Sequence, residues 1–247
     1  MTPRHYPTTR RTTMRIPALI VATATLVAAP VAIAATKDQG IDASVTSSKA
    51  GTAKKPRNVG INVVLTTPAP PAGKQFATQR AVLSLPKGLK FNGAKFPECT
   101  AAKLQSGGGA ACPAGSKVGS GSANAVALNG KINAALTVTA YNAAKGKKLL
   151  LHVQGSQPIQ INSILEGTLK TKSSGATLDV PIPANLKSIA GAQPTLTRFA
   201  TKIQATRKGV GYVQSTSCPA GGWKFGANLS FTDGDTGADT DTVACKK

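Results

Sequence analysis

The stretch INAALTVTAY, residues 132–141, indicates the fold class of this chain most clearly. Apolar side chains such as Leu136 and Val138 fall at every second position, and polar ones such as Thr137 fall between them. Strict alternation of this kind is typical of a half-buried β-strand. The dipeptide Asn129-Gly130 stands just before it and favours a tight hairpin turn.

The same alternation recurs along the rest of the chain, with turn residues between the runs. The sequence offers one short helix candidate, residues 100–104. About ten strands without a long amphipathic helix predict an all-β fold, an antiparallel β-sandwich. Aromatic residues are scarce, and we expect Trp223, Phe225 and Phe231 to fill its core. The other predicted strands cover residues 61–65, 81–85, 149–153, 159–169, 178–182, 199–205, 210–215 and 223–231.

Residues 1–34 have the pattern of a signal peptide. Four arginines precede an uncharged apolar run over residues 16–31, and the small-residue triplet Ala32-Ile33-Ala34 follows it. The run is short for a membrane span, which needs about 20 residues; an uncleaved anchor is the alternative, and translation starts at Met1 or Met14. We expect cleavage near Ala34, a secreted or cell-envelope-associated protein, and no transmembrane segment in the mature chain.

Two parts follow the signal peptide. Residues 35–58 are polar and basic, with few large apolar side chains, and predict a flexible basic lead-in. Residues 59–247 are long enough for one sizeable core and predict a single β-sandwich domain.

All four cysteines, Cys99, Cys112, Cys218 and Cys245, follow the signal peptide. An even number of cysteines in an exported protein predicts two disulfides. Of the three pairings, the sequential one, 99 with 112 and 218 with 245, closes two local loops. A zinc site is the alternative, but no two cysteines are two to four residues apart, as zinc ligands usually are. His152 is the one histidine that follows the signal peptide.

Several of these motifs carry a resemblance. They are Leu85-Pro86-x-Gly88-Leu89, Cys112-Pro113-x-x-Ser116-x-Val118-Gly119, and the ending with Ser215-Thr216-Ser217-Cys218-Pro219, Trp223 and Cys245. In these turn and disulfide motifs, residues 60–245 resemble secreted β-rich proteins of actinobacteria. The resemblance implies an exported bacterial β-rich protein and supplies no catalytic or binding residue.

Motifs for catalysis are weak throughout. Ser84-x-x-Lys87 matches a short nucleophile motif, but Pro86 interrupts it and the partner motifs of that enzyme class are missing. His152 stands in an apolar run with no adjacent acid, as a structural histidine does. We therefore expect no enzyme. The alternative is an extracytoplasmic carbohydrate-binding domain or hydrolase with a groove that uses Glu166 or Asp179.

Four of the nine acids, Asp233, Asp235, Asp239 and Asp241, fall within nine residues. Calcium prefers several carboxylate oxygens, so this segment is a weak calcium candidate. It does not match the EF-hand loop, which has Gly at its sixth position and Glu at its twelfth. A solvated loop closed by the second disulfide is the simpler interpretation, and no other cofactor is expected.

Charge is the one global signal of function. The chain carries 30 Lys+Arg against 9 Asp+Glu; without residues 1–34 it keeps 26 of those cations and every acid, a net charge of +17. Such a surplus attracts polyanions, and Lys54, Lys55 and Arg57 are the candidate contacts. Export, few arginines and few aromatics speak against nucleic acid. The sequence therefore predicts a non-catalytic structural or interaction module at the cell envelope that binds anionic envelope polymers; a mere solubility role for the lysines is the alternative.

Overall fold

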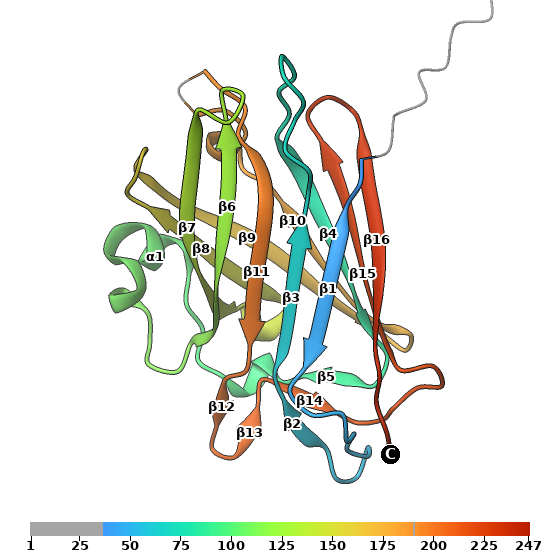
Figure 1. Ribbon diagram of the computed structural model, residues 1–247. Coiled ribbons are helices and arrows are strands. Elements are labelled where there is room, and N and C mark those ends of the chain that lie inside the picture. The colour runs from blue at the N-terminus through green and yellow to red at the C-terminus, as the bar shows by residue number, and fades with distance from the viewer. Residues whose placement is uncertain (1–36, 190) are drawn as a thin grey trace, which may run out of the picture. The chain divides into compact units, whose positions relative to one another are not determined.

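The computed structural model describes residues 37–189 and 191–247, which form mainly antiparallel strands (Figure 1). The predicted signal peptide, residues 1–34, lies outside the described residues. Sixteen strands and two α-helices are present there, together with three 3-10 turns. The strands are β1 (Gly40–Val45), β2 (Arg57–Val59), β3 (Ile61–Thr66), β4 (Thr78–Pro86), β5 (Leu89–Phe91), β6 (Lys117–Ala127), β7 (Ile132–Ala143), β8 (Lys148–Gly155), β9 (Ile161–Lys172), β10 (Gly175–Pro181), β11 (Thr195–Ile203), β12 (Thr206–Arg207), β13 (Val210–Gly211), β14 (Val213–Ser215), β15 (Trp223–Phe231) and β16 (Thr236–Val243).

Eleven of these strands form one continuous sheet, in the order β1-β3-β11-β6-β7-β8-β9-β10-β4-β15-β16. All neighbours in this order are antiparallel. The sheet curls until its edge strands β1 and β16 lie side by side, which makes a nearly closed barrel (Figure 1). The all-β antiparallel class is thus confirmed, but one curled sheet replaces the two sheets of a sandwich. Alternating strands have the same pattern in both architectures, so periodicity does not separate them.

The hairpin predicted from residues 132–141 is confirmed. β7 pairs with β6 from Ala127 opposite Ile132 onward. Leu128, Asn129 and Gly130 all have positive φ, between 51° and 82°. Asn and Gly adopt this conformation more readily than other residues, which explains why the chain turns here.

The lead-in predicted over residues 35–58 is ordered from Gly40 onward, which corrects that expectation. β1 occupies residues 40–45 and pairs with β3 along its whole length. Ile41 and Ala43 alternate with polar residues and are buried. Two such small-to-medium side chains are a weak signal in a polar segment. Pairing with β3 on one side of the strand, and hydrogen bonds to the Asp239 and Asp241 side chains on the other, supply the remaining stability.

Both disulfides, Cys99–Cys112 and Cys218–Cys245, form as predicted. The first anchors helix α1 (Ala101–Gly107), where the helix candidate was expected, against the outside of the barrel. Thr100 begins this helix by accepting a hydrogen bond from the Lys103 backbone N–H. The second helix, α2 (Ala184–Lys187), is a single turn, and the described helices include none long and apolar enough to cross a bilayer.

The main core lies inside the barrel. Trp223, Phe225 and Phe231 of β15 are almost fully buried in it, as predicted. A small three-stranded sheet, in the order β2-β14-β5, lies at one end of the barrel (Figure 1). This small sheet brings together loops that are far apart in the sequence.

Candidate functional site

The aspartate segment predicted to bind calcium makes other contacts. Lys37 Nζ lies 2.8 Å from Asp233 Oδ2 and 2.6 Å from Asp235 Oδ2. The same ammonium group lies 4.0 Å from the ring centroid of Phe76, a cation–π distance. Burial opposes the charged form of Lys37, but the hydrogen bonds that its ammonium group donates to the two carboxylates, together with their negative charge, raise its pKa overall.

The other two carboxylates join the edges of the sheet. Asp239 Oδ2 accepts a hydrogen bond from the Ile41 backbone N–H at 2.9 Å, and Asp241 Oδ2 accepts one from Ala43 at 2.7 Å. Within residues 37–189 and 191–247, no group of three or more His, Cys, Asp or Glu side chains could hold a metal ion. Calcium binding stays a prediction that this geometry does not favour.

The end of the barrel that carries the small sheet is strongly basic. Lys54 and Lys55 lie in a turn closed by the hydrogen bond from the Thr52 N–H to the Lys55 oxygen, and Arg57 begins β2. Eight further cations lie in the short strands, turns and loops beside them, and all eleven side chains are exposed. We call this set the basic end: Lys49, Lys54, Lys55, Arg57, Lys87, Lys90, Lys95, Arg207, Lys208, Lys246 and Lys247.

Hydrogen bonds between the loops hold these cations on one surface. The backbone of Ala50 bonds to Lys246, and Thr216 bonds to Gly88. Arg207 Nη1 donates to the Lys95 oxygen at 2.9 Å. In Figure 1, β2, β5, β12, β13, β14 and the C-terminus share this end of the barrel.

Little negative charge faces the basic end. The segments 46–57, 86–97, 204–222 and 243–247 contain no Asp or Glu. The ion pairs of the described chain involve Lys37, Arg80 and Lys148, none of which belongs to the basic end. The eleven cations therefore keep their charge available to a partner.

The residues of the alternative enzymatic prediction are engaged elsewhere. Asp179 accepts two hydrogen bonds from the Arg80 guanidinium, which lowers the pKa of the carboxyl. Glu166 pairs with Lys148 at 2.7 Å. A glycosidase needs one carboxyl that stays protonated, and Asp179 is shifted the other way. His152 is buried with its Nε2 at 2.6 Å from Asn162 Oδ1, a structural position.

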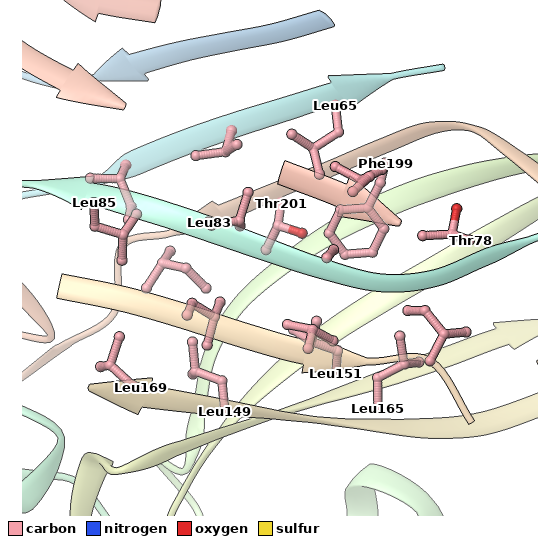
Figure 2. Close-up of a pocket in the computed structure, with 18 of the residues that line it drawn as sticks. Leu65, Thr78, Leu83, Leu85, Leu149, Leu151, Leu165, Leu169, Phe199 and Thr201 are labelled. Carbon is pink, nitrogen blue, oxygen red and sulfur yellow. The ribbon is translucent and has the colours of Figure 1, made fainter. Parts of the chain in front are cut away.

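The interior of the barrel contains unfilled apolar space (Figure 2). Two cavities of about 90 and 70 Å³ adjoin each other, since five residues line both. Leu83 and Phe199 line the larger one and are only partly buried, although they point inward. The residues common to both cavities are Thr78, Leu165, Ile182, Leu196 and Phe199.

Two hydroxyl groups in this wall have no partner. The Oγ1 atoms of Thr78 and Thr201 are buried and make no hydrogen bond in the described structure. Thr78 is 4 % exposed. Figure 2 shows both threonines among the leucine side chains of the larger cavity. A third hydroxyl in the wall, that of Tyr212, bonds to Asn142 Oδ1 at 3.2 Å.

Sequence reasoning found three of the eleven cations of the basic end and none of the cavity. Seven of the other eight cations lie in residues 87–95, 207–208 and 246–247, which are far apart in the sequence, and no local pattern marks these segments as neighbours. The cavity residues read as ordinary strand positions, because a sequence pattern shows which side faces inward but not how well the inside is filled.

Comparisons with protein-family models, with curated proteins and with solved structures find no match to this chain. The resemblance to secreted actinobacterial proteins stays a prediction. The two disulfides indicate an oxidising, extracytoplasmic location.

Proposed function

We propose that this chain is a non-catalytic interaction protein of the cell envelope whose basic end binds an anionic envelope polymer. The observation that carries the proposal is the gathering of eleven exposed cations on one end of the barrel, in segments that contain no acid. The fields of neighbouring cations add, so such a surface attracts a polyanion much more strongly than the same charges spread evenly.

The kind of cation favours a diffuse partner. Nine of the eleven are lysines and two are arginines. A lysine is a flexible, strongly hydrated point charge, whereas arginine binds phosphate or carboxylate through a fixed fork. A lysine-rich surface therefore suits a polymer with repeated phosphate or carboxylate groups more than a single shaped ligand.

An open groove of about 780 Å³ continues from the basic end along β4 and β15. It is lined by two cations, Lys87 and Lys224, and by one acid, Asp239, whose carboxylate accepts hydrogen bonds from backbone N–H groups. Gly226, opposite Ser84, leaves room in the groove because it has no side chain. The groove offers a path along which a polymer chain extends beyond the basic end.

Cosedimentation of residues 35–247 with purified actinobacterial cell walls, across a salt series, tests the proposal. Exposed charges are screened within a Debye length, which is about 10 Å at 0.1 M salt. We expect binding at low salt that is lost between low and moderate salt. Absence of binding at low salt contradicts the proposal, and the lysines then serve solubility alone.

A further inference from the structure

The cavity inside the barrel is a second candidate site, separate from the basic end. Its wall is made by inward side chains of β3, β4, β8, β9, β10 and β11 and is almost wholly apolar. We propose that this cavity binds a small uncharged molecule that has an apolar body and one hydrogen-bonding group, and that the Thr78 hydroxyl pairs with that group.

The size of the space limits the ligand. The two adjoining cavities measure about 90 and 70 Å³. An engineered apolar cavity of about 150 Å³ stays dry and binds benzene. The apolar body that fits is therefore an aromatic ring or a short alkyl chain.

The lining excludes a charged ligand. No Lys, Arg, His, Asp or Glu is among the residues that line either cavity. An ionised group moved from water into such a wall has no counter-charge, so its desolvation is not compensated. The hydrogen-bonding group must be neutral, such as a hydroxyl or a carbonyl.

Thr78 places an unpaired polar group in the apolar wall of the cavity. Its hydroxyl is buried, unpaired and shared by both cavities. A buried hydroxyl without a partner destabilises the fold, and a ligand group that bonds to it removes that penalty. Water is a poor occupant, because a buried water makes about three hydrogen bonds and only two unpaired hydroxyls line this space.

Three probes of one size separate the possibilities: toluene, benzyl alcohol and benzoate. Binding is followed by saturation-transfer NMR and by the shift of the melting temperature of residues 35–247. At a salt concentration that screens the basic end, we expect toluene and benzyl alcohol to bind and to raise the melting temperature, and benzoate to do neither. If neither neutral probe binds, or if benzoate binds as well as they do, the proposal is overturned.

Variants locate the bound probe. Thr78→Val keeps the side-chain shape and removes the hydroxyl. We expect it to weaken the binding of benzyl alcohol about fivefold, the effect of losing one typical hydrogen bond. The affinity for toluene should stay the same. Thr177→Val makes the same change on the outer face of β10, beside the buried Leu178. As the control, it should change the affinity for neither benzyl alcohol nor toluene. Ala81→Leu fills the larger cavity and abolishes binding of both neutral probes.

Two outcomes contradict the assignment. If Thr78→Val weakens the binding of toluene and of benzyl alcohol equally, the Thr78 hydroxyl does not pair with the ligand. Undiminished binding in an Ala81→Leu variant that melts cooperatively places the probe outside the barrel. Neither result bears on polymer binding by the basic end, which is measured without these probes.

Discussion

The backbone N–H of Ile41 in β1 donates to the carboxylate of Asp239 in β16, with the two atoms 2.9 Å apart. Ala43 and Asp241 repeat the arrangement two residues further on. Eleven strands with antiparallel neighbours throughout must end with two parallel edge strands, and here these edges are joined by side chains. Below them, Ala50 and Lys246 bond through their backbones.

Removing these carboxylates should loosen the seam between β1 and β16. We expect Asp239→Ala and Asp241→Ala each to lower the free energy of unfolding by about 1–2 kcal/mol, because each leaves a partly buried backbone N–H unpaired. Asp42→Ala, an exposed site on β1, is the matched control and should be nearly neutral. Urea denaturation measures all three; equal effects at the three sites would contradict the role of the seam.

Alkaline pH should destabilise the fold through Tyr212. Burial raises the pKa of its hydroxyl above the ordinary value of about 10. The folded protein therefore holds a proton that the unfolded chain releases above about pH 10, and stability falls as the pH rises through that range. The stability of Tyr212→Phe should fall less steeply between pH 9 and about pH 11 in urea denaturation. Identical slopes for the two proteins would refute this assignment.

The second disulfide should stabilise the end of the seam. Cys245 lies two residues beyond the end of β16, and its bond to Cys218 joins positions 27 residues apart. Replacing both cysteines with serine should lower the free energy of unfolding by about 3 kcal/mol, the typical effect for a loop of this size. A melting temperature equal to that of the unaltered protein would show that the bond adds nothing.

Calcium should have little effect on this protein. The carboxylates of the aspartate segment already bind Lys37 and the backbone of β1. Calorimetric titration with calcium up to millimolar concentration should give no saturable heat. A saturable signal that disappears in Asp233→Asn would restore the calcium site.

Local features of the fold could be predicted from the sequence. The β6–β7 hairpin follows from alternation and Asn129-Gly130, and the sequential disulfides follow from loop closure. The closure of the barrel could not be predicted, because it depends on hydrogen bonds between residues 198 positions apart. The aspartates resemble a metal site in the sequence for the same reason, since their partners, Lys37 and the backbone of β1, are distant along the chain.

The candidate sites divide in the same way. Lys54, Lys55 and Arg57 form a local cluster and were predicted as polyanion contacts. Lys208 and Lys246 are distant from this cluster in the sequence. They lie beside it because β14 pairs with β2 and because the C-terminal segment pairs with Lys49. The cavity depends on the balance between side-chain volume and barrel width, which no single strand reveals.

A pair of matched charge variants tests the central claim most directly. Lys54→Gln with Lys55→Gln removes two charges from the basic end, and Lys74→Gln with Lys131→Gln removes two from exposed loops at the opposite end. A lysine near an anionic surface contributes about 1 kcal/mol, so the first pair should weaken cosedimentation with cell walls at low salt by at least about tenfold. The second pair should bind nearly as well as the unaltered protein. Equal weakening by both pairs would contradict binding through the basic end and would leave only a nonspecific effect of net charge.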